Sequence, residues 1–400
     1  MLETEEAARR LGVKRSTLYA YVSRGLLRSH PTPSGRRSLF DVEEVEQLAR
    51  RGRGGRATET RLATVTTAVT QVRDDGPYYR GRQVTGLAGT ATFEEVTGLL
   101  WGTGRRTVVP GEWDVPDLGL APDLPTADRH RWALVMAGAL DPVRADRRPE
   151  AVVRAARRLI AALVDVVLPA HRGDAEGSRH RAAELARNHV AQEGTVAARL
   201  ADRLSPVATP DLVAAVDAAL VLLADHELAT STLAVRVAAS TRADLYDAVL
   251  AGWATLAGPL HGGASRLAHA MLQDAEVRGV EQAVDGALRW QRQVPGFGHP
   301  LYEHGDPRAA VLLEHADRLA TPSQREVVGA LVALAATHDL PPPNVDLGLA
   351  AVTWAAGLGP DAGQALFSIA RVAGWTAHYL EELGEQPLRF RARAVYAAPR

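Results

Sequence analysis

The sequence predicts a mainly α-helical protein preceded by a small winged helix-turn-helix domain. Two patterns carry this prediction. After a hairpin-like segment that ends near residue 81, apolar residues recur at helical spacing up to the C-terminus, with Arg, Glu and Asp between them. Ahead of that region, two short helical patterns are joined by a glycine turn. No G-x-G-x-x-G follows a strand pattern, so a dinucleotide-binding α/β fold is not expected.

The composition of the 400 residues excludes several kinds of site. The absence of Cys removes disulfides, thiolate metal sites, iron–sulfur clusters and a cysteine nucleophile. The only lysine is Lys14, whose surroundings fit neither a P-loop nor a Schiff base. No window approaches the roughly 18 consecutive apolar residues of a membrane helix, and the first residues lack the apolar core of a signal peptide. We therefore expect a cytoplasmic protein without a membrane segment.

Charge is distributed unevenly along a chain whose net charge is -1. Residues 1–56 carry 12 basic and 7 acidic side chains, whereas acidic side chains dominate the remainder. The same boundary holds a run of Gly and Arg without apolar residues, as a flexible connector requires. We therefore predict a helix-turn-helix domain at 1–50, a linker at 51–59 and a large domain at 60–400.

The N-terminal domain has the elements of a helix-turn-helix with a wing. Thr4 is predicted to cap a first helix, a turn follows at 12–13, and a second helix covers 16–25. A small hairpin is predicted around 35–37, and Asp41 is predicted to cap a third helix. The stretches AARRLGVKRSTLYAYVSRGLL and GRRSLFDVEEVEQL resemble the winged helix-turn-helix of the MerR and excisionase families.

That resemblance implies contacts to DNA through the second helix and the wing. Basic and hydroxyl side chains at these positions reach phosphates and base edges. In this sequence they are Lys14, Arg15, Ser16, Thr17, Tyr19, Arg36 and Arg37. Helix-turn-helix modules also serve as protein-interaction elements. DNA binding by residues 1–56 and a role as a protein-interaction element are therefore both open.

The large domain opens on a predicted β-hairpin and continues with helices. Thr and Val alternate over 64–72, a turn falls at 74–76, and a second strand is expected near 78–81. Gly- and Pro-rich breaks between the later helices occur at 258–263, 295–300 and 341–343.

Histidines and a carboxylate stand in or near those breaks. His261 lies in G-P-L-H-G-G and His299 in P-G-F-G-H-P, where glycines let a ligand approach the backbone. Asp346 ends the loop P-P-P-N-V-D, and His226 closes an apolar helix. This pattern favours acid–base chemistry, because imidazoles donate to developing negative charge and a desolvated carboxylate serves as a base. No metal site is predicted, since H-x-x-x-H and H-E-x-x-H are missing, and without G-x-S-x-G a Ser-His-Asp hydrolase is not expected.

Six separated motifs resemble those of the citrate synthase family, which includes citrate and 2-methylcitrate synthases. They occur in the family order and are ADHELATSTLAVR (224–236), GPLHGGA (258–264), PGFGHPLYEHGDPRA (295–309), PPPNVDLGLA (341–350), ARVAGWTAHYLEE (370–382) and PLRFRAR (387–393). The segment YYRGRQVTGLAGTATFEEVTGLLW (78–101) is similar to the N-terminal part of that family. The resemblance implies a citrate synthase fold: a nearly all-α homodimer in which a smaller, mobile helical domain, about 263–350, closes over the substrates.

The family's reaction joins the acetyl group of acetyl-CoA to the ketone of oxaloacetate and then hydrolyses the thioester, with no cofactor beyond the CoA thioester substrate. By motif position, Asp346 matches the base that removes a methyl proton, His261 the group that stabilises the enol, and His299 the donor to the ketone. The residues that match carboxylate-binding positions are His226, Arg308, Arg371 and Arg389, the last supplied across the dimer interface. Arg suits this task because its planar fork binds carboxylates bidentately.

Three positions depart from the family pattern. Pro300 stands where an Arg on the CoA side is usual, Ala229 replaces an Asn, and the C-terminal R-P-R reads R-F-R, which makes Arg391 a second candidate anion-binding residue. Arg80 and Arg292 are candidates to replace the missing basic group. The acyl group is open between acetyl and propionyl, which differ by one methylene. A different class also stays open: a DNA-binding regulator whose citrate-synthase-like domain senses a metabolite.

Overall fold

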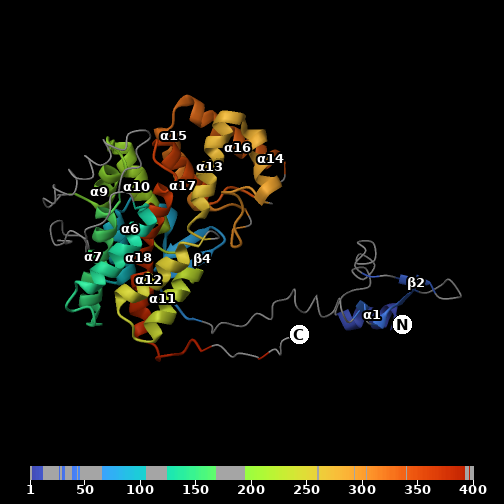
Figure 1. Ribbon diagram of the computed structural model, residues 1–400, viewed down its shortest axis with the longest axis horizontal. Helices are drawn as coiled ribbons and strands as arrows, with labels where there is room; N and C mark the ends of the chain where they lie inside the picture. Colours follow the sequence, from blue (N-terminus) through green and yellow to red (C-terminus); the bar gives the residue numbers. More distant parts are fainter. Residues whose placement is uncertain are drawn as a thin grey trace. The chain divides into compact units, whose positions relative to one another are not determined.

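The structure, a computed structural model, divides the chain into two units, which are described separately (Figure 1). The first comprises residues 1–65 and 392–400, and the second residues 66–391. The described residues are 2–11, 27, 29–31, 38–42, 44–45, 65–104, 124–167, 194–258, 261–291, 293–302, 304–338, 340–391 and 396. The predicted linker at 51–59 lies outside them, as do the predicted DNA-contacting residues Lys14, Arg15, Ser16, Thr17, Tyr19, Arg36 and Arg37.

The first unit contains a short helix and a three-stranded antiparallel sheet. Its elements are β1 (Leu2–Glu3), α1 (Thr4–Leu11), β2 (Ser29–Pro31) and β3 (Ser38–Phe40), and the strand order is β1-β3-β2. His30 pairs with Leu39, which confirms the hairpin predicted around 35–37. The pairing of β1 with β3 is an addition that the sequence did not predict.

Two polar contacts and a small apolar core hold the first unit together. The predicted cap at Thr4 is wrong: α1 begins at Thr4 itself, whose Oγ1 donates to the Ser38 carbonyl at 3.3 Å and so ties the helix to the sheet. Asp41 accepts a hydrogen bond from the Glu44 amide at 3.2 Å, which confirms the predicted cap there. The buried apolar side chains of this core are Leu2, Ala7, Ala8, Leu27, Phe40 and Val45.

The second unit begins with the predicted hairpin. β4 (Thr70–Arg73) pairs antiparallel with β5 (Gly76–Tyr79), which pairs with β6 (Arg82–Gln83). The first strand starts at Thr70, later than the alternation from 64 predicts. Gly76 follows the turn with a φ of 126°, which few side chains tolerate, so glycine is needed there.

Helices make up most of the remaining described residues of the second unit, as predicted. They are α4 (Val84–Leu87), α5 (Phe93–Trp101), α6 (Thr126–Ala139), α7 (Pro149–Asp165), α9 (Val196–Leu204), α10 (Pro210–Leu223), α11 (Thr230–Ser240), α12 (Leu245–Leu256), α13 (Ala264–Arg278), α14 (Val280–Gln291), α15 (Pro307–Leu319), α16 (Pro322–Thr337), α17 (Val345–Ala355) and α18 (Ala362–Leu383). Their sequences specify several of the starts. Thr92 and Glu95 form a capping box at α5, while Asp306 and Asn344 accept from first-turn amides of α15 and α17.

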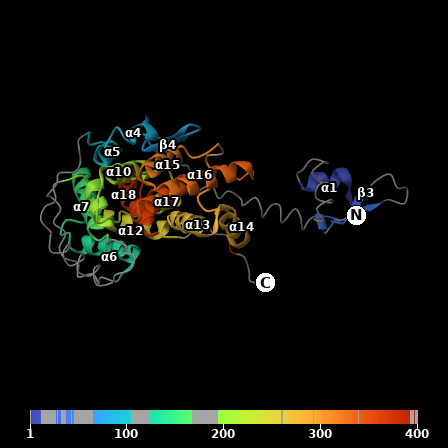
Figure 2. The same cartoon turned by 90° about the horizontal axis from the view of Figure 1, so that it is seen from above.

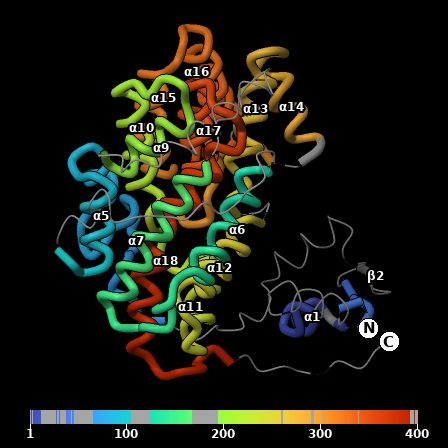
Figure 3. Tube along the Cα trace, turned by 60° about the vertical axis from the view of Figure 1, so that its left-hand side comes forward, coloured from blue at the N-terminus to red at the C-terminus, as the bar shows by residue number. Residues whose placement is uncertain are grey.

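α18 is the central helix of the second unit. Figure 3 shows it running between α7 on one side and α11 and α12 on the other, and it also packs against α5 and α10. The residues from Ala362 to Tyr379 are nearly all buried, polar ones included. Each fully buried Leu, Ile or Phe side chain contributes roughly 1.5–3 kcal/mol relative to an exposed one. The helix is therefore a fixed frame for the polar side chains that it carries, Arg371 among them.

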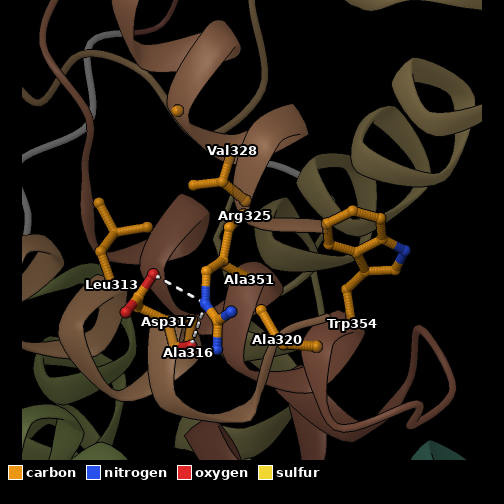
Figure 4. Close-up of a pocket in the computed structure, with 10 residues that line it drawn as sticks. Leu313, Ala316, Asp317, Ala320, Arg325, Val328, Ala351 and Trp354 are labelled. Carbon is orange, nitrogen blue, oxygen red and sulfur yellow. Dashed lines mark hydrogen bonds and ion pairs between the residues drawn. The ribbon is translucent and has the colours of Figure 1, made fainter. Parts of the chain in front are cut away.

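Helices α13 to α17 gather at one end of the second unit. α17 lies between α15 and α13, and α14 and α16 pack against α13 and against each other (Figure 1, Figure 2). A pocket of about 170 Å³ lies among α15, α16 and α17, with Trp354 and the Arg325–Asp317 ion pair in its lining (Figure 4). The predicted small domain at 263–350 covers α13 to α16 and the first half of α17. Its closure over substrates stays a prediction.

Neither a membrane-spanning helix nor a metal-binding cluster occurs among the described residues. No helix among them is both long and apolar enough to cross a membrane. No group of three or more His, Asp and Glu side chains within the same ranges is arranged to hold a metal ion.

Candidate active site

Six of the seven predicted catalytic and substrate-binding residues meet in the second unit, although they come from five separate segments. They are His226, His261, His299, Arg308, Asp346 and Arg371. The ring centroids of His226 and His299 are 5.3 Å apart, and the Tyr302 ring contacts both. The charge of Arg308 acts on His226, His299 and Asp346, and the charge of Arg371 acts on His226 and His261.

His226 follows α10 in a short segment with an irregular backbone. The next residue, Glu227, has a φ of 53°, a left-handed conformation that turns the chain sharply. His226 is buried, and its Nε2 lies 2.8 Å from the Tyr302 hydroxyl. Burial, together with the charges of Arg308 and Arg371, lowers the pKa of His226 well below its ordinary value. The ring is therefore neutral at pH 7.

His299 sits on a loop that is bonded to the loop preceding α17. The backbone N–H of Gly298 donates to the Pro342 carbonyl at 2.8 Å, and the backbone N–H of Asn344 donates to the Gly296 carbonyl at 2.9 Å. Gly296 and Gly298 have positive φ values of 83° and 78°, and a Cβ on Gly296 would lie 2.8 Å from that of Leu347. These two glycines therefore allow the loops to approach this closely.

The tautomer of His299 follows from its backbone contact. The Leu301 amide donates to Nδ1 at 3.1 Å, so Nδ1 carries no proton and Nε2 is a donor. Burial and the charge of Arg308 lower the pKa of His299. The result is a neutral imidazole with one N–H available for a ligand.

His261 lies in the turn between α12 and α13. The amide of Gly262 donates to the Leu256 carbonyl at 2.8 Å, and a side chain on Gly262 would collide with that carbonyl. His261 Nε2 is 2.9 Å from the Ser231 hydroxyl, and its ring meets the Phe367 ring edge-on at 6.0 Å. Burial and the charge of Arg371 lower the pKa of His261 to about 4. This ring is also neutral at pH 7.

Asp346 occupies the first turn of α17. Its amide donates to the side chain of Asn344 at 3.0 Å, which fixes the start of the helix. The carboxylate oxygen Oδ1 is buried and has no hydrogen-bond partner among the described residues. Burial raises the pKa of Asp346 to about 6, and the neighbouring Asp306 adds to the effect while Arg308 opposes it. A carboxylate of this kind is poised to exchange a proton near neutral pH.

Arg308 is buried at the start of α15 and is held by the residue that caps that helix. Its Nε and Nη2 donate to the two oxygens of Asp306 at 2.9 Å and 2.8 Å. Asp306 also accepts from the Val345 amide at 3.1 Å, so one carboxylate joins the starts of α15 and α17. Although burial alone would raise it, the pKa of Asp306 is lowered because Arg308 stabilises the charged form.

Arg371 is a buried arginine that is only partly paired. Its Nε donates to the Leu223 carbonyl at 2.9 Å, at the end of α10, and its guanidinium lies 4.7 Å from the Phe367 ring. Nη1 is buried and finds no hydrogen-bond partner in the part of the chain that the structure describes. A buried guanidinium with a free N–H is suited to bind a ligand carboxylate.

Arg389, the seventh predicted residue, lies elsewhere in its own chain. It follows α18, and its Nε and Nη2 donate to the Glu382 oxygens at 2.7 Å and 2.6 Å. Glu382 stands eleven residues after Arg371 on one helix, which corresponds to roughly 16 Å. The structure therefore does not bring Arg389 to the other six residues of its own chain.

Sequence reasoning missed four residues that shape this site. Tyr302 contacts two of the histidines, Ser231 contacts His261, and Asp306 and Asn344 position Arg308 and Asp346. All four stand inside the quoted motifs, but their residue types alone do not distinguish them from surface polar groups. Arg80, a candidate CoA contact, donates to the Leu100 carbonyl at 2.7 Å, and Arg292 lies outside the described residues.

Two family models match the chain. One, described as "Citrate synthase, C-terminal domain", matches residues 58–393. The other, described as "Helix-turn-helix domain", matches residues 1–53.

Curated relatives and solved structures agree with the first match. "Citrate synthase 2" of Bacillus subtilis (strain 168) is 32% identical over 364 residues, which cover 84% of this chain and 94% of the relative. "2-Methylcitrate synthase" of Shewanella oneidensis is 31% identical, covering 85% and 93%. A citrate synthase from Thermoplasma acidophilum, solved with carboxymethyl coenzyme A and oxaloacetate, superposes with a TM-score of 0.68 at 24% identity, over 87% of this chain and 96% of that one. At that identity the superposition establishes the fold.

Proposed function

Because the chain belongs to the citrate synthase family, we propose a residue-level mechanism for its reaction, the condensation of an acyl-CoA with oxaloacetate. The observation that supports the assignment is the buried Oδ1 of Asp346, which has no hydrogen-bond partner among the described residues and shares a site with three neutral imidazoles. An α-proton of a thioester is a very weak acid. A carboxylate removes it only if donors stabilise the enolate as it forms.

In the first step, Asp346 takes a proton from the α-carbon of the acyl-CoA. Its pKa of about 6 leaves it ionised at pH 7 but basic enough to accept that proton. His261 donates to the thioester oxygen as the enolate forms, and it is a neutral donor because its pKa is about 4. In this scheme the Ser231 hydroxyl donates to Nε2 of His261, so the ring proton is on Nδ1, which donates to the thioester oxygen.

In the second step, the nucleophilic carbon attacks the ketone of oxaloacetate. The Nε2–H of His299 points away from its backbone contact and donates to the ketone oxygen, which becomes the hydroxyl of the product. Arg371, Arg308 and His226 bind the substrate carboxylates. Water then hydrolyses the thioester, which releases CoA and the tricarboxylic acid. No metal or prosthetic group is needed in this scheme, and CoA takes part only as the thioester substrate.

The acyl group is acetyl, propionyl or both, since named relatives of similar identity include a citrate synthase and a 2-methylcitrate synthase. The test is release of free CoA from acetyl-CoA and from propionyl-CoA, with and without oxaloacetate, measured with a thiol reagent. The protein itself has no Cys and gives no background. Oxaloacetate-dependent release supports the mechanism, and the ratio of the two rates identifies the substrate. A folded protein that binds oxaloacetate but releases no CoA would contradict it.

We further propose that the working form is a homodimer in which Arg389 serves the partner's site. Arg389 does not reach the site of its own chain, and large apolar side chains are exposed on or beside α6 and on α13. They are Trp132, Val135, Leu140, Val143 and Leu267. Such residues are typical of a surface that a second subunit covers.

Mixed dimers test the shared site directly. Arg389→Ala and Asp346→Asn subunits are each expected to be inactive alone. Mixed under conditions that exchange subunits, they form dimers with one intact site, and about a quarter of the wild-type rate is expected to return. Failure of activity to return in dimers shown to have exchanged would contradict the shared site.

A second candidate function is DNA binding by the N-terminal unit. The helix-turn-helix match over residues 1–53 and the excess of basic residues up to residue 56 favour it. DNA affinity is then expected to fall steeply with salt, because counterions are released on binding. The Lys14→Ala/Arg15→Ala double variant is expected to weaken binding while leaving CoA release unchanged. Binding that is unaffected by this variant would contradict the assignment. The cytoplasmic location stays a prediction.

A further inference from the structure

A buried polar cluster lies directly behind His226 and has no part in the mechanism described above. Asp225, the preceding residue, is fully buried. Its Oδ2 accepts from Thr70 Oγ1 at 2.5 Å and lies 3.1 Å from His378 Nε2. Thr70 comes from β4 and His378 from α18, so two distant elements converge on the residue next to the predicted oxaloacetate ligand.

The protonation of His378 follows from its other neighbour. Arg236 Nη1 lies 2.8 Å from His378 Nδ1, and a guanidinium can only donate. Nδ1 therefore accepts, the ring proton is on Nε2, and His378 donates to Asp225. Arg236 does not depend on this contact alone, since it also donates to Glu381 at 2.7 Å and to Glu382 at 2.9 Å.

The backbone of Asp225 is also held, at both its N–H and its C=O. The Tyr79 hydroxyl accepts from the Asp225 amide and donates to the Asp225 carbonyl, both at 3.0 Å. Gly374 of α18 donates its amide to the Ala224 carbonyl at 3.0 Å. With side chain and backbone both held, the direction in which the chain enters His226 is determined by these contacts.

We propose that Thr70 and His378 are positioning residues for the condensation: through Asp225 they hold His226 in the orientation that binds oxaloacetate. This proposal rests on the assignment of His226 as an oxaloacetate ligand. Neither residue reaches the substrate, so the expected signature is a change in oxaloacetate affinity with little change in turnover. Loss of one buried hydrogen bond of this kind corresponds to about a tenfold change in an equilibrium constant.

Two substitutions of His378 separate its two nitrogens. In His378→Gln the amide nitrogen takes the place of Nε2, so the donor to Asp225 is kept and the acceptor for Arg236 is lost. In His378→Asn the amide oxygen takes the place of Nδ1, so the acceptor is kept and the donor is lost. We expect the oxaloacetate KM to rise about tenfold in His378→Asn, with kcat and acyl-CoA KM within about twofold of wild type. In His378→Gln we expect all three constants within about threefold.

The contrast between these variants excludes a merely structural role. Both lose one buried hydrogen bond, so a general loss of stability would affect them alike. Equal oxaloacetate KM values in the two variants, or values within twofold of wild type in both, would overturn the proposal.

Substitutions of Thr70 provide a second test, which applies even if the His378 variants do not fold. Thr70→Val removes the donor to Asp225 at constant shape, and Thr70→Ser keeps it. We expect a severalfold rise in oxaloacetate KM for Thr70→Val and recovery in Thr70→Ser. Thr376→Val is the matched control, because Thr376 is equally buried on α18 but donates only to the Val372 carbonyl of its own helix. A KM for Thr70→Val equal to that of this control would count against the proposal.

Calorimetric binding of oxaloacetate to each variant keeps this inference separate from the proposed mechanism. If wild type releases no CoA but binds oxaloacetate, the mechanism fails while the order of affinities, wild type and His378→Gln above His378→Asn, still tests the positioning role. If turnover is intact and that order is absent, the positioning role fails and the mechanism stands.

Discussion

The segment that carries His226 and the loop that carries His299 place two imidazoles 5.3 Å apart but are held by different means. The His226 segment is held mainly by buried side chains, namely Thr70, Tyr79 and His378. The His299 loop is held by backbone hydrogen bonds to the neighbouring Pro-rich loop, with a few polar side chains at their junction.

This difference indicates how the site divides its tasks. The first segment belongs to the core around α18, so it opens only when that core opens. The His299 loop is less buried, and together with the first turn of α17 it carries the proposed ketone donor, His299, and the proposed base, Asp346. Hydrogen bonds between the two loops join His299 to Asp346, so we expect these residues to move together when substrate enters.

The largest effect on turnover is expected from replacing Asp346, the proposed base. Asp346→Asn keeps the size of the side chain and removes the base. We expect kcat to fall about 10²–10⁴-fold, while oxaloacetate binding measured by calorimetry stays within a few-fold of wild type. Turnover at the wild-type rate would show that another group removes the proton.

A steric clash introduced behind His226 is expected to destabilise the buried segment that carries this residue. In Gly374→Ala the added Cβ would overlap Asp225 Oδ1 and lie 2.5 Å from the Ala224 carbonyl, and neither can move freely in the core. The free energy of unfolding is expected to fall by about 3 kcal/mol, measured by urea denaturation. Gly329→Ala on α16, where nothing lies within 4 Å of the new Cβ, is the control. It is expected to stabilise by about 0.4–1 kcal/mol, and equal losses in both would refute the contact argument.

The pH dependence of stability tests the environment of Asp346 without measuring turnover. The pKa of Asp346 is about 6 in the folded protein and 3.8 ordinarily. Between these two pH values the folded state binds a proton that the unfolded state has lost. Above pH 6 the carboxylate is charged in both states, and its burial lowers the free energy of unfolding. Asp346→Asn is therefore expected to stabilise by about 3 kcal/mol above pH 6.5, with the gain disappearing below pH 4. In wild type, kcat is expected to fall as the pH drops through 6. A gain that is independent of pH would contradict this assignment.

The smallest effect is expected from loosening the tie between the two loops. Asn344 caps α17, and its side-chain Nδ2 donates to the Gly298 carbonyl at 2.7 Å. Asn344→Ala is expected to lower the free energy of unfolding by about 1 kcal/mol and to lower kcat severalfold. Asn344→Ser restores the cap but not the tie, so stability is expected to return while kcat stays low. A serine variant with wild-type kcat would show that the tie does not position His299 against Asp346.

Periodicity and turn signals predicted much of the fold, and the resemblance to the family motifs predicted which residues lie close together. The hairpin before the helices, the helical pattern after it and the six converging residues are all present in the structure. Periodicity, turns and caps are local properties, so they can be recognised along the chain. Thr4 shows the limit of such rules, because a contact with Ser38, far away in sequence, replaces the local cap.

The residue types and their order along the chain indicate a helical protein with imidazoles and a carboxylate suited to acid–base chemistry. The resemblance of its motifs to the citrate synthase family adds the expected dicarboxylate and thioester substrates. Tertiary packing alone decided that Asp346 has a raised pKa and that three imidazoles are neutral. The same packing pairs Arg308 with Asp306, whereas Nη1 of Arg371 has no hydrogen-bond partner among the described residues. It also decided that His378 meets Asp225, 153 positions away. The physical reason is that burial and distance between charges depend on which segments meet in space, and these set the pKa values and the hydrogen-bond partners.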